Sequence, residues 1–245
     1  MAETCQILEW DSQFFRKRIA RLQGSLLTAE TIQQAETWCR EQGVDCLYFL
    51  SSADDPQTIR LVEEHDFHFV DVRLTFEHFP NKQVDFPAHP AIRLVKPTDL
   101  EQLKQIARGS YRVTRFYFDQ NFNPAEADRL YEAWIEKSCS GYAQAVLVYA
   151  EEERVLGFVS CHLEGAHGQI GLVGVAETAR GKGVGVAAVQ HSLNWFAGQG
   201  VTTVEVFTQG RNIAAQRLYQ RCGFLTEKME LWYHRWFEQD AEEKN

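Results

Sequence analysis

The chain has 245 residues, of which 44% are hydrophobic and 24% charged, and its formal net charge is −9. The length allows one large domain or two small ones, and the composition is ordinary for a globular protein. The acidic balance argues against a nucleic-acid-binding protein, which would need a basic excess. An anionic ligand is still allowed, because a few local cations can bind a phosphate on an acidic protein.

The six cysteines form no CxxC pair, and the eight histidines show no zinc-type spacing with them. This pattern predicts reduced thiols and no metal site. The N-terminal residues lack the basic and apolar regions of a signal peptide, and no apolar run approaches the roughly 20 residues that span a bilayer. We therefore expect a cytoplasmic protein.

Three of the six prolines fall in the polar segment 80–90, which is typical of a linker. We expect an N-terminal domain over 1–80, a linker over 81–90, a longer domain over 91–237 and an acidic tail over 238–245. In the first domain, apolar periodicity predicts strands over 19–27, 45–51 and 69–79 and helices over 29–42 and 56–65. Thr28 or Thr31 is expected near the start of the first helix, and Gly43 at its end.

The longer domain begins with a predicted strand over 91–95 and a helix that Asp99 caps, ending near 108. A helix over 124–138 follows, then strands over 145–149, 155–163 and 169–175. The remaining elements are helices over 185–197 and 213–221 and strands over 203–208 and 229–236. The expected fold class is α/β or α+β, with a mixed central sheet.

An internal repeat appears when the chain is shifted by 157 positions. The shift places Trp38 on Trp195 and the run 42–44 (QGV) on 199–201 (QGV), and it keeps the order helix, strand, helix, strand. We interpret the N-terminal domain as a degenerate copy of the C-terminal half. Two differences bear on chemistry: Asp55 stands where Asn212 stands, and Val62 stands where Tyr219 stands.

A glycine-rich turn, 180–185 (RGKGVG), lies between a predicted strand and a predicted helix. Glycines allow close backbone approach to a ligand, and the first turn of the helix offers free N–H groups and the positive end of the dipole. Arg180 and Lys182 add positive charge. The segment therefore predicts an anion cradle, although it fits neither a P-loop nor a Rossmann glycine motif.

With the residues that follow it, this loop resembles the signature of GNAT acetyltransferases. The R-x-x-G-x-G pattern after a strand resembles their pyrophosphate-binding motif, and 194–224 (NWFAGQGVTTVEVFTQGRNIAAQRLYQRCGF) resembles the rest. The resemblance implies the GNAT fold, preceded here by the smaller degenerate GNAT-like domain, and acetyl-CoA as the acetyl donor.

A narrower resemblance spans nearly the whole chain. The runs LEWDSQFF, RFYFD and LWYHRW look like TDP-fucosamine acetyltransferases, which acetylate the 4-amino group of a dTDP-4-amino-4,6-dideoxygalactose. This likeness implies a nucleotide-sugar acceptor. A peptide N-terminus, a lysine or another small amine stays open as the acceptor, as does a non-catalytic module that only holds acetyl-CoA. A homodimer is also open.

The GNAT resemblance implies roles for individual residues. Tyr219 occupies the position of the general acid, and a phenol can protonate a thiolate of similar basicity. Asp71 stands where related sugar acetyltransferases carry a proposed base, with His162 and Glu164 as rivals. The cofactor-binding residues implied are Leu172, Val173, Gly174, Val175, Arg180, Gly181, Lys182, Gly183, Val184, Gly185, Asn212 and Tyr219.

An aromatic and basic cluster, Arg115 with Phe116 and Tyr117, offers a second anion site. These side chains could hold the diphosphate of a nucleotide and stack on its base. The alternative is a buried anchor for a loop.

Overall fold

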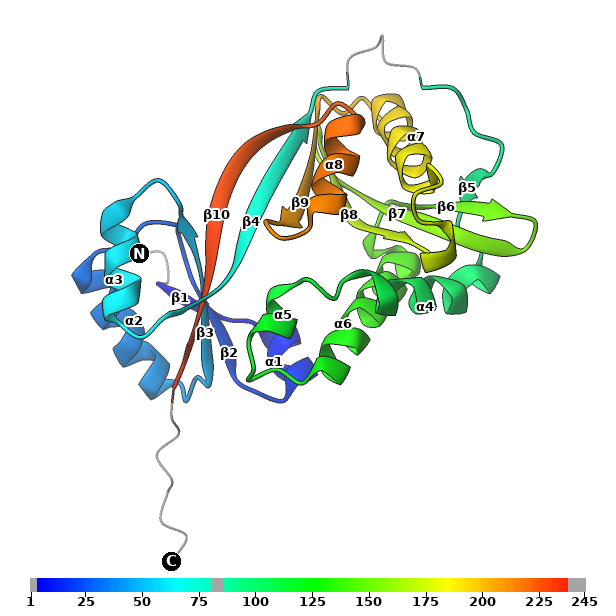
Figure 1. The fold of residues 1–245 in the computed structure, drawn as a ribbon. Helices are drawn as coiled ribbons and strands as arrows, with labels where there is room; N and C mark the ends of the chain where they lie inside the picture. Colours follow the sequence, from blue (N-terminus) through cyan, green and yellow to red (C-terminus); the bar gives the residue numbers. More distant parts are fainter. Residues whose placement is uncertain (1–3, 81–85, 238–245) are drawn as a thin grey trace, which may run out of the picture. The chain divides into compact units, whose positions relative to one another are not determined.

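The computed structural model describes residues 4–80 and 86–237 (Figure 1). Residues 81–85 of the expected linker and the expected tail 238–245 lie outside these ranges. The chain divides into two compact units. The first contains the described residues up to Arg73, Phe118–Phe122 and those from Met229 onward, and the second contains Leu74–Tyr117 and Asn123–Lys228. This division differs from the expected one at residues 80 and 91, because two long strands contribute residues to both units.

The first unit is a sheet in the order β1-β2-β3-β10-β4. Strands β2 and β3 are parallel, and β10 pairs antiparallel with β3 from Glu230↔Ser52 to Trp236↔Cys46. The elements are β1 (Cys5–Ile7), α1 (Glu9–Phe15), β2 (Ile19–Leu22), α2 (Ala29–Glu41), β3 (Cys46–Ser52), α3 (Pro56–Glu64) and parts of β4 (His68–His78) and β10 (Leu225–Trp236).

Local sequence explains the bounds of α2. The Thr28 hydroxyl accepts the Thr31 N–H at 3.2 Å, which caps the start, and Gly43 has a φ of +61° just after the end. Apolar residues of α2 and α3 pack on one face of the sheet. This core includes Ile32, Cys39, Phe49, Val62 and Tyr233.

The second unit continues the order as β4-β9-β8-β7-β6-β5. Strands β8 and β9 are parallel, while β5 to β8 pair antiparallel. The elements are β5 (Ile92–Leu94), α4 (Leu100–Ser110), α5 (Arg115–Phe118), α6 (Pro124–Lys137), β6 (Ala145–Glu151), β7 (Arg154–Glu164), β8 (His167–Val175), α7 (Val184–Gly198), β9 (Thr203–Gln209) and α8 (Ile213–Arg221).

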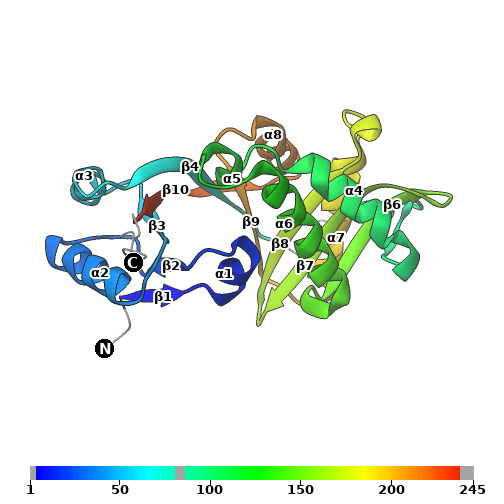
Figure 2. The same cartoon turned by 90° about the horizontal axis from the view of Figure 1, so that it is seen from below.

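Helices cover both faces of this second sheet (Figures 1 and 2). On one face, α7 packs Val189, Leu193 and Phe196 into the main core. On the other face, α4 lies against β7 and β8, and α6 lies against α4. Because the sheet is buried between two helical layers, its strand ends are the places where backbone polar groups can meet a ligand.

The repeat is visible in the element bounds. A shift of 157 carries β3 (Cys46–Ser52) onto β9 (Thr203–Gln209) and α3 (Pro56–Glu64) onto α8 (Ile213–Arg221). It also carries the first residue of β4 onto the first residue of β10. The sequence repeat is therefore a structural repeat in these elements.

Several expectations need correction. Strand β2 ends at Leu22 rather than 27, because Gly24 turns the chain with a φ of +83°. Asp99 does not cap α4 with its side chain; its carboxylate accepts the Lys96 N–H and pairs with Arg93 at 2.7 Å. The closing strand begins at Leu225 rather than 229, and the short elements β1, α1 and α5 were not expected.

No helix among residues 4–80 and 86–237 is both long and apolar enough to cross a bilayer.

Candidate active site

The second unit has an open strand edge between β8 and β9. The two strands pair from His167↔Thr203 to Ile170↔Val206, although β8 continues to Val175 and β9 to Gln209. In the described part of the chain, no further pairs join them. The strands therefore separate toward their carboxyl ends, and main-chain groups of β8 are left for other partners.

A β-bulge lies where the separation begins. The β7–β8 register passes from Val159↔Val173 to Cys161↔Ile170, so β8 carries one extra residue. The displaced Leu172 N–H donates to Ser160 Oγ at 2.8 Å. A Cβ at Gly171 would lie 2.4 Å from His162 Nε2, so any other residue there would have to displace that ring.

The hydrogen-bond pattern defines which polar groups face the open edge. Ala176 N–H donates to Leu156 O at 2.8 Å, which makes this a hydrogen-bonded antiparallel pair. Hydrogen-bonded and non-hydrogen-bonded pairs alternate, so Val173 and Val175 turn their N–H and C=O groups away from β7. Two carbonyls and two N–H groups thus point toward the gap.

Both of these carbonyls are already engaged. The Tyr111 hydroxyl donates to Val173 O at 2.9 Å, and Arg180 Nε donates to Val175 O at 3.4 Å. Arg180 also reaches the end of α4, where its Nη2 donates to Gly109 O at 3.0 Å. The open edge therefore presents mainly N–H donors.

The glycine-rich turn follows directly after this edge. Gly181 and Gly183 have φ angles of +75° and +85°, which favour glycine, and a Cβ on either would meet nothing within 4 Å. Gly183 is the N-cap of α7, and no side chain caps the helix. The first N–H groups of a 15-residue helix therefore face an exposed turn, as an anion site requires.

The predicted cofactor residues of 172–175 and 180–185 thus lie in one continuous stretch of the second unit. Lys182 is exposed beside the turn. The geometry gives Arg180 a role the sequence did not suggest, since its guanidinium binds backbone carbonyls. That the residues of 172–175 and 180–185 contact a pyrophosphate and a pantetheine arm stays a prediction.

Tyr219 lies on α8 and is 4% exposed. Its ring packs against Phe76 and Phe224, with centroids 5.9 and 5.8 Å away. Burial raises the pKa of Tyr219 above its usual value, so the hydroxyl keeps its proton at neutral pH.

Asn212 is the N-cap of α8. Its Oδ1 accepts the Ala215 N–H at 3.2 Å. The matching residue in the first unit, Asp55, caps α3 in the same way by accepting the Thr58 N–H at 2.8 Å. Capping accounts for the polar residue at both positions, and a pantetheine contact by Asn212 stays a prediction.

The candidate bases occupy different units. Asp71 is 2% exposed in the first unit, and its Oδ1 accepts the Val72 N–H at 2.9 Å. His162 lies in the second unit beside the bulge, 3.4 Å from Ser160 Oγ, and burial lowers its pKa. Glu164 is exposed at the end of β7.

The aromatic and basic cluster is mostly engaged within the fold. Phe116 is 1% exposed, and the Arg115 guanidinium lies 4.4 Å from its ring centroid. The Tyr117 hydroxyl donates to Asp128 at 2.5 Å. Burial first, and then this bond, raise the pKa of Tyr117. The geometry favours the anchor alternative for Phe116, and nucleotide binding by the cluster stays a prediction.

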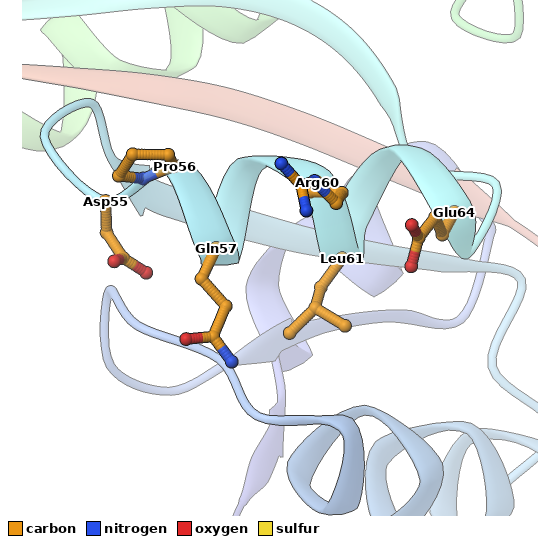
Figure 3. Close-up of a pocket in the computed structure, with 6 residues that line it drawn as sticks. All are labelled: Asp55, Pro56, Gln57, Arg60, Leu61 and Glu64. Atoms are coloured by element: carbon orange, nitrogen blue, oxygen red, sulfur yellow. The ribbon is translucent and has the colours of Figure 1, made fainter.

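The first unit contains a shallow hollow of about 640 Å³ along α3 (Figure 3). Its lining does not overlap the predicted site residues. The side chains around it are Asp55, Pro56, Gln57, Arg60, Leu61 and Glu64. They mix both charges and include no glycine turn, so the hollow has no cradle comparable to that of the second unit.

Two residues of the site were missed by sequence reasoning. Tyr111 and Ser160 make side-chain to main-chain bonds to β8, and neither belongs to a recognisable motif. A Tyr shortly after a helix and a Ser within a strand carry no signal that distinguishes them from packing residues. In residues 4–80 and 86–237, no cluster of three His, Cys, Asp or Glu side chains could hold a metal ion.

Comparison with known families agrees with this geometry. The family model described as "Acetyltransferase (GNAT) family" matches residues 100–224, which is about half of the chain. The chain belongs to this family, and the class of enzyme expected from the sequence, an N-acetyltransferase, is confirmed. The matched range contains the open edge, the glycine turn and Tyr219.

Two curated relatives carry names linked to sugars. The chain is 30% identical over 145 residues to the dTDP-fucosamine acetyltransferase of Escherichia coli O6:H1, covering 58% of this chain and 62% of the relative. It is 22% identical over 235 residues to the spore coat polysaccharide biosynthesis protein SpsD of Bacillus subtilis, covering 93% of this chain and 81% of the relative. The chain thus spans less than two thirds of the first relative.

A solved GCN5-related N-acetyltransferase from Sphaerobacter thermophilus has the same fold. It superposes with a TM-score of 0.69 and 17% identity, over 95% of this chain and 76% of the other. The expected GNAT fold with a mixed sheet is confirmed.

Proposed function

We propose that this protein transfers an acetyl group from acetyl-CoA to a primary amine, the 4-amino group of a dTDP-4-amino-4,6-dideoxy sugar. One observation carries the proposal: the end of β8 is not paired with β9, and the glycine turn after it leads to an uncapped helix start, in a unit that also buries Tyr219. These features are the donors, the anion cradle and the acid that acetyl transfer from a thioester needs.

The residues fit acetyl-CoA along their length. The N–H groups at the start of α7, with Gly181 and Gly183 in left-handed conformations, would hold the pyrophosphate. The N–H groups of Val173 and Val175 would bond to carbonyl oxygens of the pantetheine arm and the thioester. Bound acetyl-CoA supplies an activated acetyl thioester.

The proton balance of the transfer involves two groups. The acceptor amine forms the new C–N bond as the C–S bond breaks. Tyr219 gives its hydroxyl proton to the departing thiolate and regains one from solvent. A base takes, through water, the proton that the amine loses; His162 is the candidate within the second unit, and the role of Asp71, which lies in the first unit, stays a prediction. A raised pKa favours Tyr219 in the role of acid, because the hydroxyl is not ionised beforehand.

The choice of acceptor is supported by the relatives. One is named for acetylation of dTDP-fucosamine, and the other for polysaccharide biosynthesis. The second likeness covers 93% of the chain, so it includes the N-terminal unit as well as the acetyltransferase region. We further propose that this first unit is a degenerate GNAT half-domain that has lost the cofactor site.

A thiol-release assay tests the function. Purified full-length protein is given acetyl-CoA and a panel of dTDP-amino sugars, free amino sugars, small amines and peptides. Release of free CoA with a dTDP-4-amino sugar, and mass-spectrometric detection of the N-acetylated product, is the expected result. Release of CoA only with a peptide or a small amine would contradict the proposed sugar acceptor and would still support acetyl transfer to an amine.

Calorimetry with CoA separates two further outcomes. Uptake of CoA without transfer to any acceptor would indicate a binding module. Absence of CoA uptake by folded protein would contradict the assignment of the cofactor site itself.

A further inference from the structure

Tyr111 is a second phenol at the open edge, and no motif assigns it a role. It follows α4 directly and is partly buried. Its ring stacks on Tyr131, with centroids 4.3 Å apart and planes inclined by 13°. Its hydroxyl donates to Val173 O at 2.9 Å. The stacked ring fixes the hydroxyl at one point of the strand edge.

The carbonyl it engages matters because of where it points. Val173 turns its polar groups away from β7 and into the gap, which the hydrogen-bonded pair Leu156 and Ala176, three residues along the ladder, requires. An uncapped carbonyl there would face the carbonyl oxygen of an incoming thioester, and two acceptors repel each other. A carbonyl that accepts the Tyr111 proton presents less negative charge, and the neighbouring N–H remains as a donor.

The edge has a direction. Val173 lies two residues farther from the glycine turn than Val175, so it marks the end of the edge toward the acetyl group. Val175 lies closer to the glycine turn, and Arg180 engages its carbonyl. The two side chains that donate to these carbonyls therefore act at different points: Tyr111 at the reacting end of the edge and Arg180 at the diphosphate end.

We propose that Tyr111 is a positioning residue that covers the Val173 carbonyl and so makes the open edge selective for the acetyl thioester. The inference rests on the proposed function, since it assumes that acetyl-CoA lies along this edge. Burial, followed by the nearby phenols Tyr219 and Tyr131, raises the pKa of Tyr111. The hydroxyl therefore remains a proton donor at every pH at which the enzyme would be assayed.

The test is Tyr111→Phe in the full-length protein. Phe keeps the stacked ring and removes only the donor. Calorimetry measures Kd for acetyl-CoA and for CoA, and steady-state kinetics measures kcat with the acceptor found in the panel. We expect the acetyl-CoA Kd to rise about 5- to 10-fold, the effect of one hydrogen bond, with the CoA Kd nearly unchanged. We expect kcat to fall at least as much.

The matched control is Tyr142→Phe, which removes a hydroxyl from a tyrosine 60% exposed in the same unit. It should change none of these values. An equal shift of both Kd values in Tyr111→Phe, or no shift in either, would overturn the inference. A wild-type protein that binds neither ligand would instead overturn the proposed function. A thermal unfolding temperature within a few degrees of the wild-type value shows that Tyr111→Phe is folded. The same Kd and kcat measurements on Tyr131→Phe test a variant of the stacked pair in which the hydroxyl of Tyr111 is intact.

Discussion

The two repeats share a scaffold and differ at one strand edge. In the second unit, β8 and β9 separate after Ile170↔Val206 and leave a gap. In the first unit, β2 and β3 pair from Ile19↔Cys46 to Arg21↔Tyr48, and the loop after β2 bonds to the end of β3 and to α3. Ser52 N–H donates to Ser25 O at 2.9 Å, and Leu27 N–H donates to Thr58 Oγ1 at 2.8 Å. The main-chain groups that would face a ligand are used to hold the loop.

The side chains at equivalent positions also differ between the two units. Val62, fully buried in the apolar core, stands where Tyr219 stands, so the first unit keeps the packing and lacks the hydroxyl. Asp55 stands where Asn212 stands, and its carboxylate would repel a diphosphate. The comparison indicates that the same scaffold can leave backbone groups at this edge for a ligand or use them to hold a loop.

The largest expected effect is that of Tyr219→Phe, which makes the second unit resemble the first at this position. Loss of a general acid typically costs about 100-fold or more in rate, so kcat should fall by at least that factor. The CoA Kd should stay within about two-fold, because the ring remains in place. Because the pKa of Tyr219 is raised, the wild-type rate should show no alkaline decline below pH ~10 from this group. Equal kcat in the variant would exclude Tyr219 as the acid.

A second prediction concerns a buried polar cluster that distinguishes the first unit. His234 Nδ1 lies 2.6 Å from Asp119 Oδ2, and Trp236 Nε1 donates to the same oxygen at 2.9 Å. Burial alone would raise the pKa of Asp119, but bonds from His234, the Asn121 N–H and Trp236 outweigh it and lower the value to about 2.

Because its folded pKa lies below the unfolded value, Asp119 contributes stability that is present above pH ~4 and is lost as the pH falls toward 2. Asp119→Asn should therefore lower the free energy of unfolding by about 2 kcal/mol at neutral pH, and by less in acid. Urea unfolding at several pH values measures this. The exposed Asp54→Asn is the control and should have no comparable effect. A loss that does not shrink between pH 4 and 2 would contradict the account.

A matched pair of glycines sharpens the comparison further. Gly183 in the cradle and Gly24 in the corresponding loop have φ angles of +85° and +83°, and a Cβ on either meets nothing within 4 Å. Substitution by Ala costs about 1–2 kcal/mol of backbone strain at each. Gly183→Ala should weaken CoA binding about 10-fold, whereas Gly24→Ala should leave it unchanged. Equal effects on CoA affinity would show that strain acts on the whole molecule rather than on the cradle.

The smallest expected effect concerns the number of CoA molecules bound per chain, which should not rise above one. Calorimetry should give one CoA per chain, because the first unit has no open edge. Thr58→Ala removes one of the two bonds that hold the loop after β2, and this variant should still bind one CoA, since the glycine turn and its cations are lacking there. Two CoA molecules per chain would show that the closed edge can open.

The amino-acid sequence by itself determined most of the elements and predicted the location of the cofactor site. Apolar periodicity, the Thr28 cap and the glycines at 43 and 183 depend on neighbours a few residues away, so they are readable locally. The repeat also predicted that β3 and α3 would match β9 and α8, because equal patterns fold into equal elements.

Only the tertiary structure decided which backbone groups are left unpaired. The bulge at Gly171, the cap that Tyr111 places on Val173 and the bonds that close the first unit join residues 12 to 62 positions apart. It also decided the division into units, since β4 and β10 each contribute residues to both units. Such pairings depend on strand register and on side chains that meet through space, and neither has a signature in local sequence.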